Sequence, residues 1–429
     1  MLPHPEHTVT THNLTNYNDM LKDWYVDDRI KSLSYGANPF YAMLKKSNGQ
    51  MAGARQYIQP IEIELPGGES ADFNEAMTNN HQALWEQFVL ARKAQYKRVL
   101  VDYELLAATR QRREAFEKAM DIFDKGFKGF GAKLGRRLFR TVGGSVGRLA
   151  LSSTSTTTGT FEDRAQIFNL TNGMKLQFST VDGTGTLLDG GDFVTVTGID
   201  HRNNTFTVDQ NFATAISGIT TTSYAFQKGD HALCVNGLED WLPVDDRATR
   251  LAATYNSVAR DTAPVYLGGV YVDGTSMALD EVLINLVGEI GMFGGMTDTI
   301  FANPRTLTDM QLLASSKLRV MQMESEMRSA TGDLLVGFSG FKVVIGDKTV
   351  RVFGDRHCPM TRIYALQLDT WTLWHAGETV NWLGEEITGN KLQPAQNEPS
   401  AEARLGSWCN LGCNAPGYNG VAKINASSN

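Results

Sequence analysis

The sequence predicts an α+β protein of several domains, in which one long helix precedes a small all-β region. Its 429 residues are too many for one ordinary core. Apolar residues recur at helical spacing through residues 104–140. Residues 150–232 instead hold short alternating segments, with a turn signal about every ten residues, as in a small β-barrel or sandwich.

The composition is that of an ordinary globular protein, with 42% hydrophobic and 20% charged residues. No apolar run approaches the roughly 18 residues that a membrane-spanning helix needs, so no membrane partner is expected. The polar N-terminus lacks the apolar core of a secretory signal, which predicts maturation in the cytoplasm. A net charge of −7 argues against a dedicated nucleic-acid reader, which normally carries a basic excess.

Two extended features are expected before the helix. Residues 1–54 are polar with scattered aromatics and little periodicity, and they predict an N-terminal arm. Residues 55–65 alternate as in a strand, residues 96–101 form a second candidate strand, and a turn-rich tip follows Pro66. These segments predict a protruding β-ribbon over residues 55–103, which should rest on another surface because an isolated ribbon is marginal in water.

The predicted helix has one apolar stripe, which favours a core role over a partner interface. Its members lie at spacings of three and four, namely Phe116, Met120, Phe123, Phe127, Phe130, Leu134 and Leu138. Several glycines between residues 126 and 135 indicate either a bend or close approach of other backbone.

Seven basic residues and no acidic one lie between residues 125 and 148. They are Lys125, Lys128, Lys133, Arg136, Arg137, Arg140 and Arg148. Such a run is either a solvated helix face or a sequence-independent contact with phosphates, and the sequence leaves both open.

Mixed α/β structure is expected again after residue 232. Residues 276–292 are amphipathic, residues 299–302 predict a buried strand, and Asn303-Pro304 predicts the start of another helix. Further strands are expected at residues 341–345, 349–353, 362–368 and 371–374. By contrast, the preceding segment from residue 149 to 230 is acidic, with eight acidic and four basic residues, which predicts a module displayed at the surface.

No motif supports catalysis, so no enzyme activity, catalytic residue or cofactor is expected. Gly143 to Gly147 matches G-x-S-x-G, but that motif needs a strand before it and a helix after it, the reverse of the order here. Neither a group of His4, His7 and His12 nor the adjacent His357 and Cys358 favours a metal site. The four cysteines, Cys234, Cys358, Cys409 and Cys413, are expected to be small buried apolar residues.

The order of these features resembles the major capsid proteins of tailed bacteriophages, which have the Hong Kong 97 fold. Two strings carry further resemblance: Phe301 to Asp309 is similar to a strand-to-helix passage of the axial domain, and Gly237 to Leu242 to the segment that enters it. The resemblance implies an arm (1–54), an extended loop (55–103), the spine helix of the peripheral domain (104–149), an inserted β-barrel or sandwich (150–232), an axial domain with part of the peripheral domain (233–375) and a C-terminal return (376–429).

The resemblance also implies a function: self-assembly into hexamers and pentamers of an icosahedral head, formed in the host cytoplasm, that encloses double-stranded DNA. A portal, a separate scaffolding protein and a decoration protein are the expected partners. The expected intersubunit contacts are Glu69, Asp72, Phe73, Arg92, Lys93 and Arg98, and the expected DNA-facing residues are Lys125, Lys128, Lys133, Arg136 and Arg137.

The sequence is also compatible with two other functions. An encapsulin-type bacterial compartment would have the same fold around protein cargo. A surface- or carbohydrate-binding protein would act through residues 150–232 alone.

Overall fold

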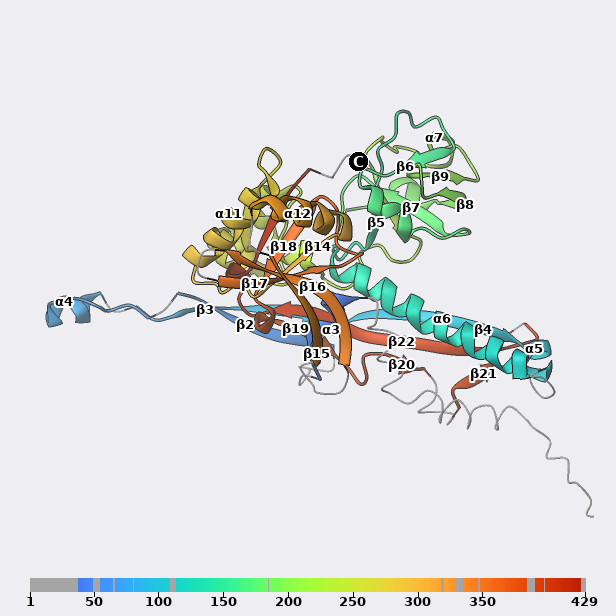
Figure 1. The fold of residues 1–429 in the computed structure, drawn as a ribbon, viewed down its shortest axis with the longest axis horizontal. Coiled ribbons are helices and arrows are strands. Elements are labelled where there is room, and N and C mark those ends of the chain that lie inside the picture. The colour runs from blue at the N-terminus through green and yellow to red at the C-terminus, as the bar shows by residue number, and fades with distance from the viewer. Residues whose placement is uncertain are drawn as a thin grey trace, which may run out of the picture.

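The computed structural model describes residues 38–48, 55–64, 66–79, 81–108, 113–183, 185–317, 320–328, 335–345, 348–383, 390–396 and 398–425. Within these residues the strands form one seven-stranded sheet, two six-stranded sheets and two separate strand pairs. Figure 1 shows one of these pairs projecting far from the body, and the long helix lying along one of the sheets. The α+β class predicted from the sequence is confirmed.

The first six-stranded sheet is built around the long strand β22 (Ser400–Cys413), which pairs antiparallel with β4 (Lys93–Asp102) over most of its length. The other members are β1 (Lys45–Ser47), β19 (Trp371–His375), β20 (Asn381–Trp382) and β21 (Leu392–Pro394). Nearly every residue of β22 is buried, and other strands of the sheet pair with both of its edges.

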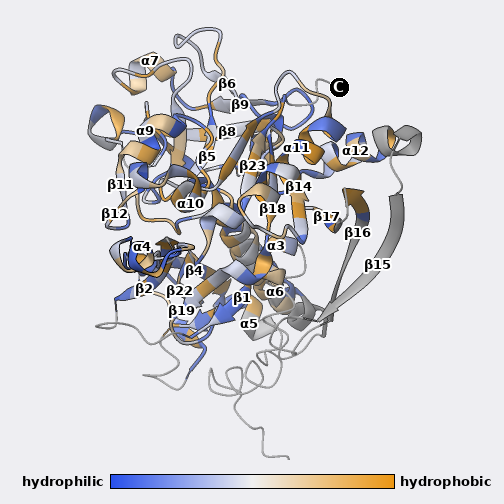
Figure 2. Cartoon of the chain, turned by 90° about the vertical axis from the view of Figure 1, so that its left-hand side faces the viewer, coloured by the Kyte–Doolittle hydropathy of each residue, from blue (hydrophilic) through white to orange (hydrophobic). Residues whose placement is uncertain are grey.

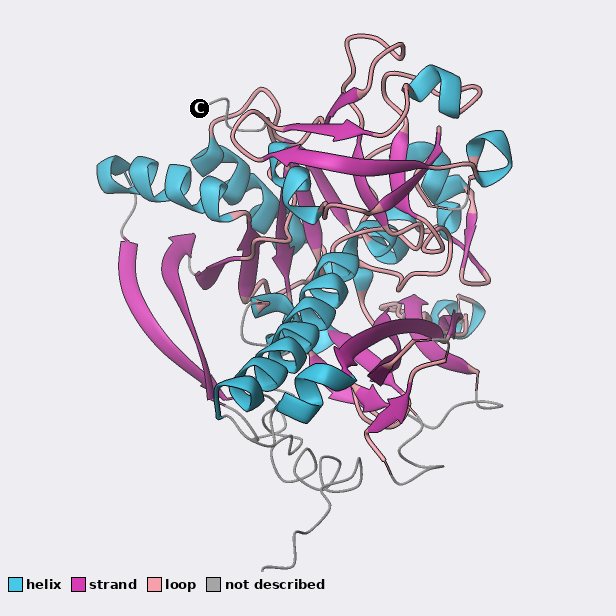
Figure 3. Cartoon of the chain, turned by 90° about the vertical axis from the view of Figure 1, so that its right-hand side faces the viewer, coloured by secondary structure: helices cyan, strands magenta, loops and turns pink. Residues whose placement is uncertain are grey.

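Helix α6 (Arg113–Leu138) covers one face of that sheet, preceded by the short α5 (Tyr103–Ala108). The predicted stripe is confirmed for Met120, Phe123, Phe127, Phe130, Leu134 and Leu138, all of which are buried. The predicted close approach of backbone is also present: a Cβ at Gly126 would lie 2.8 Å from Cγ2 of Val99 on β4. The glycine therefore lets the helix sit directly on the strand (Figure 3).

The seven-stranded sheet forms the second half of the body. Its strands, in spatial order, are β13 (Val270–Asp273), β23 (Gly420–Lys423), β18 (Arg362–Leu366), β14 (Thr299–Ala302), β17 (Lys348–Gly354), β16 (Leu335–Ile345) and β15 (Val320–Arg328). Helices α11 (Leu279–Met292) and α12 (Pro304–Lys317) pack beside it, and Asn303 caps α12 as predicted. The inner strands β14 and β18 are largely hydrophobic (Figure 2).

A compact β module occupies residues 145–227. Its strands, in spatial order, are β5 (Ser145–Arg148), β10 (Tyr224–Gln227), β7 (Lys175–Ser179), β8 (Val194–Asp200), β9 (Thr205–Val208) and β6 (Thr158–Thr160). A bridge between Leu149 and Phe161 joins the first strand to the last, so the sheet closes on itself. Stacked rings of Phe161 and Phe206, with centroids 5.0 Å apart, lie in its interior. The short alternating segments that the sequence predicts between residues 150 and 232 are thus confirmed as strands, among them β7, β8 and β9.

The end of the predicted N-terminal arm belongs to the core. Residues 1–37 and 49–54 lie outside the described residues, but α3 (Pro39–Met43) and β1 are described. Phe40 and Tyr41 are fully buried, and the Phe40 ring packs 5.2 Å from that of Phe301. The prediction that this stretch is an arm is wrong for residues 38–48, because two aromatic side chains anchor it between the two halves of the body.

The ribbon is shorter than predicted and has a different return strand. β2 (Gln56–Glu64) pairs antiparallel with β3 (Leu84–Ala91), and the helix α4 (Phe73–Thr78) lies at the tip. The prediction that residues 96–101 return along the ribbon is wrong, since they belong to β4 and pair with β22.

The remaining described elements are short. They are α7 (Phe212–Ala215), α8 (Leu238–Trp241), α9 (Arg247–Ala252), α10 (Pro264–Gly268), β11 (Thr254–Tyr255), β12 (Val258–Ala259) and five 3₁₀ turns at Arg164–Asn169, Leu188–Gly191, Arg260–Thr262, Leu368–Thr370 and Pro416–Tyr418. Among the described helices, none is both long and apolar enough to span a membrane.

Candidate functional site

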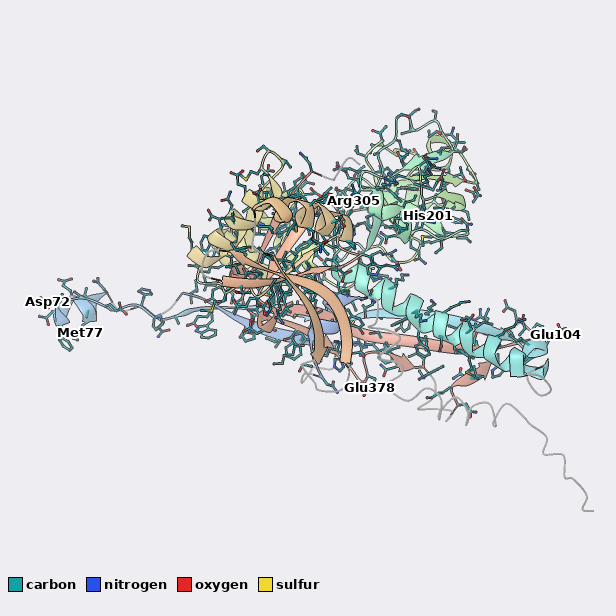
Figure 4. All side chains as sticks on the ribbon, viewed as in Figure 1. Asp72, Met77, Glu104, His201, Arg305 and Glu378 are labelled. Atoms are coloured by element: carbon teal, nitrogen blue, oxygen red, sulfur yellow. The ribbon has the colours of Figure 1, made fainter. Side chains whose placement is uncertain are left out.

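The tip of the ribbon is a protruding surface that is both apolar and acidic. Phe73 and Met77 on α4 are 77% and 66% exposed, and Figure 4 places α4 at one end of the long axis of the molecule. Asp72 caps α4 by accepting a hydrogen bond from the Asn74 amide, at 2.8 Å from Oδ1. Exposed large apolar side chains on a projecting element mark an interaction surface.

The whole ribbon carries negative charge only. Between Arg55 and Arg92 the sequence has no lysine or arginine, and its carboxylates are Glu62, Glu64, Glu69, Asp72, Glu75 and Glu86. The predicted contact residues Glu69, Asp72 and Phe73 all lie at the exposed tip. Met77 was not among the predicted contact residues, although an apolar residue within this polar tip could have indicated it.

The base of the ribbon is fixed to the body by aromatic contacts. The Tyr57 ring of β2 stacks on Trp374 of β19 with centroids 5.8 Å apart. The Phe88 ring of β3 packs edge-on against Trp241 at 5.0 Å. These contacts leave the tip free and fix the direction in which it projects.

The other three predicted contact residues lie away from the tip. Arg92 joins β3 to β4 and lies over the Trp408 ring, 5.9 Å from its centroid. Lys93 donates a hydrogen bond to the Ala232 carbonyl at 3.1 Å, and Arg98 pairs with Glu402 in the six-stranded sheet. The assignment of Lys93 and Arg98 to the ribbon is wrong, because strand β4 belongs to the body. Arg92 lies at the base of the ribbon, where its amide donates to the Arg55 carbonyl at 2.9 Å.

The basic end of α6 is mostly turned inward. Arg136 and Arg137 are buried, and Arg137 pairs with Asp230 at 2.7 Å between Nη2 and Oδ1. Lys133 pairs with the same carboxylate at 3.1 Å. The Arg137 side chain therefore holds α6 to the loop after β10, whereas Arg136 donates to the Asn169 carbonyl at 3.3 Å. Because both side chains are buried, the prediction that they face DNA is wrong. Lys125 and Lys128 remain exposed.

A basic groove of about 560 Å³ lies between α6, β4 and the β module. The cations that line it are Lys97, Arg98, Lys133, Arg136 and Arg356. None of the described residues that line it is acidic. Tyr96 on β4 and Phe168 in the β module, each 61% exposed, supply aromatic surface. Burial lowers the pKa of Lys97, which is the expected effect of a desolvated cation.

The G-x-S-x-G string has a packing role at the junction of α6 and the β module. The buried Ser145 hydroxyl donates to Oδ2 of Asp182 at 3.2 Å, and the Thr141 hydroxyl donates to Oδ1 at 2.9 Å. A Cβ at Gly143 would lie 2.6 Å from the backbone nitrogen of Gly183, so only glycine permits this approach. Burial, with a smaller contribution from the charge of Glu239, raises the pKa of Asp182 to about 6.

A buried carboxylate anchors the N-terminal segment. Asp355 accepts hydrogen bonds from the backbone amides of Phe40, at 3.2 Å, and His357, at 2.9 Å. Burial raises the pKa of Asp355 to about 6, against about 3.9 in an unfolded chain. The folded chain favours the protonated form of Asp355. The stabilisation that this form gives is therefore complete below about pH 4 and is lost as the pH rises through 6.

Asp355→Asn is expected to remove this pH dependence. Between pH 4 and pH 7 the unfolding free energy of the unmodified chain should fall by about 2 kcal/mol relative to that of the variant, given the roughly two-unit shift. Urea unfolding of both chains across this pH range measures the difference, with Asp261→Asn at an exposed position as control. A difference that does not change with pH would show that Asp355 titrates normally.

The described residues hold no group of three or more His, Cys, Asp or Glu side chains arranged to bind a metal ion. The four cysteines are buried and free of disulfides, which confirms their predicted apolar role. His4, His7 and His12 lie outside the described residues.

Comparison with solved structures identifies the fold. The chain superimposes on a chain of the cyanophage A-1(L) capsid asymmetric unit with a TM-score of 0.51 and 12% identity, covering 91% of this chain and 93% of that one. A capsid chain of a native GTA particle matches with a TM-score of 0.42, 9% identity and coverage of 99% and 96%. A chain of Mycobacterium phage Bobi matches with a TM-score of 0.41, 11% identity and coverage of 91% of both chains.

No protein-family model and no curated protein matches the sequence. The resemblance to phage capsid proteins is thus confirmed for the fold: this chain has a phage-capsid fold over about 91% of its length.

Proposed function

We propose that the chain is the major capsid protein of a tailed bacteriophage, of the Hong Kong 97 type, and that it assembles into the icosahedral head around double-stranded DNA. The observation that carries the proposal is the capsid fold, shared with the cyanophage chain over nearly all of both chains. In this scheme β2, β3 and α4 are the extended loop, α6 is the spine helix, and the β module is an insertion.

The projecting ribbon supports a role in assembly. In a single copy its apolar tip is exposed to water, and an isolated two-stranded ribbon is only marginally stable. Contact with a neighbouring copy covers both the apolar side chains and the strand edges. Such a contact joins two different surfaces and can repeat around a ring, which is how hexamers and pentamers close.

The proposed partners inside and outside the shell follow the same scheme. Lys125 and Lys128 are the remaining candidates for weak contact with packaged DNA, since both are exposed on α6. Portal, scaffolding and decoration proteins belong to this proposal, as does assembly in the host cytoplasm. A compartment for protein cargo would instead contain no DNA. A binding protein that acts through the β module would form no shell.

The proposal predicts that Phe73→Ser with Met77→Ser blocks assembly. Removing two exposed apolar side chains should leave the fold unchanged but raise the concentration needed for assembly at least about tenfold, since each buried side chain of this size contributes roughly 1.5–3 kcal/mol. Light scattering and negative-stain microscopy, with and without a scaffolding protein, measure the concentration needed for assembly.

In a separate experiment, the DNA content of particles formed by a Lys125→Glu, Lys128→Glu variant tests the proposed contact of α6 with DNA.

Met292→Ser is the matched control for the tip variant, because Met292 is 80% exposed and belongs to α11, not to the ribbon itself. A chain that stays monomeric at high concentration under all assembly conditions would refute the shell function. Equal loss of assembly in the control and in the tip variant would refute the role of the tip.

A further inference from the structure

Three cations of the basic groove, Lys97, Arg136 and Arg356, have no ion-pair partner within the described residues. The other two, Arg98 and Lys133, pair with carboxylates of the same chain. Arg136 is buried and donates to the Asn169 carbonyl at 3.3 Å, whereas Lys97 is half-buried and Arg356 is exposed. A half-buried cation keeps a desolvation cost that an incoming carboxylate would offset.

The ribbon tip has the complementary surface. Glu69, Asp72 and Glu75 are exposed, and Phe73 and Met77 lie among them. The groove combines unpaired cations with the exposed rings of Tyr96 and Phe168. The acidic side chains of the tip therefore match the cations of the groove, and the apolar side chains of the tip match its aromatic rings. Such a combination is the pattern of a specific protein interface.

One copy cannot join its own tip to its own groove. Figure 1 shows the tip and the β module on opposite sides of the seven-stranded sheet along the long axis. The aromatic contacts at the base of the ribbon fix its direction away from the groove. The contact must therefore run from the tip of one copy to the groove of another, head to tail.

We propose that the basic groove between α6, β4 and the β module receives the acidic ribbon tip of a second copy of this chain. This inference rests on the proposed shell function and names the partner surface of the ribbon. It also assigns a role to the β module, which supplies the groove wall that contains Phe168, Asn169, Thr171 and Met174. Without the module, β4 and α6 present only one wall, and the tip has no enclosed site.

Nucleic acid is the competing occupant, since phosphates also bind cations. Two features favour the ribbon tip. The groove is a bounded hollow of about 560 Å³ between α6, β4 and the β module, whereas a sequence-independent nucleic-acid site follows the backbone along an open path. The ribbon also supplies six carboxylates that have no lysine or arginine beside them in their own segment.

Crosslinking tests the contact directly. A full-length chain with Glu75→Cys is mixed with a full-length chain with Arg356→Cys and treated with a short bismaleimide. The native cysteines are buried, so the two new thiols should dominate the reaction. We expect covalent heterodimers at least tenfold above those formed when Glu281→Cys, an exposed carboxylate position on α11, replaces Glu75→Cys. Yields equal to that control overturn the inference.

Charge reversal tests whether the two charge sets act on each other. Lys97→Glu with Arg356→Glu, or Glu69→Lys with Glu75→Lys, should each raise the concentration needed for assembly at least tenfold. Asp72 is left unchanged because it caps α4. Combining all four changes should recover most of the loss. Additive losses, or no loss in either pair, overturn the inference, as does a groove variant that loses affinity for a double-stranded DNA fragment but assembles normally.

The outcomes separate this inference from the proposed function. Shells that form without the tip-to-groove crosslink leave the capsid function standing and remove the groove contact. A specific crosslink in a chain that forms only open chains of subunits keeps the contact and removes the shell.

Discussion

Replacing Arg362 with methionine is expected to lower the free energy of unfolding by about 3 to 5 kcal/mol, the usual range when one partner of a buried ion pair is removed. Arg362 on β18 is 6% exposed and pairs with Glu239 of α8 and with Asp245, the latter at 2.5 Å between Nη2 and Oδ2. Burial alone would lower the pKa of Arg362, but the two carboxylates outweigh it and raise the pKa above its ordinary value. Methionine keeps most of the volume and leaves Glu239 buried without its cation.

A second substitution distinguishes the charge effect from a packing effect. Glu239→Gln in the Arg362→Met background removes the unpaired charge and should recover a large part of the lost stability. Arg362→Lys keeps the charge but loses the planar fork that reaches both carboxylates, so an intermediate loss is expected. Urea unfolding of the unassembled chain measures all four proteins. A loss below about 1 kcal/mol for Arg362→Met would show that solvent or relaxation compensates the pair.

The elements that the sequence predicted well are those with a local signal. The stripe through Phe123, Phe127 and Phe130 needs only helical spacing, and it places the buried face of α6 correctly. Strands of the β module alternate between clear turn signals, and the Asn303 cap precedes its helix directly. In each case the residues that decide the structure lie within a few positions of one another.

The structural predictions that were wrong concern residues whose contacts are distant in sequence. Alternation in 96–101 shows a strand with two different faces, but it does not show that β22, some 300 residues later, is its neighbour. Phe40 and Tyr41 stand in a polar segment, and their burial depends on remote residues such as Phe301 and Asp355. Local pattern therefore placed the ribbon in the right region and assigned it the wrong return strand.

The same limit applies to the candidate site. The basic run on α6 is visible in the sequence, but the Asp230 that neutralises Lys133 and Arg137 follows Lys133 by 97 residues. The groove cations Lys97 and Arg356 come from two segments whose proximity only the fold creates. By contrast, Glu69, Asp72 and Phe73 were predictable because a turn-rich tip exposes its own side chains.

Trp241→Ala is expected to cost about 3 to 5 kcal/mol of stability, the usual range for truncation of a large buried aromatic side chain. The Trp241 side chain is fully buried in α8. Its ring contacts those of Phe88, Tyr255 and Trp371 at centroid distances of 5.0, 5.3 and 6.3 Å. Its Nε1 donates to the Leu411 carbonyl of β22 at 3.1 Å. One side chain thus joins the ribbon base to the six-stranded sheet.

The location of this contact gives the substitution a second expected effect. Because Phe88 belongs to β3, a cavity at Trp241 should loosen the ribbon base as well as the core. Limited proteolysis should then cut residues 56–91 faster in Trp241→Ala, and assembly should fail even below the unfolding temperature. Trp241→Phe is the control, since it keeps most ring contacts and loses only the hydrogen bond to Leu411, for roughly 1 kcal/mol. Normal assembly by a folded Trp241→Ala chain would contradict the view that this packing directs the ribbon toward its partner.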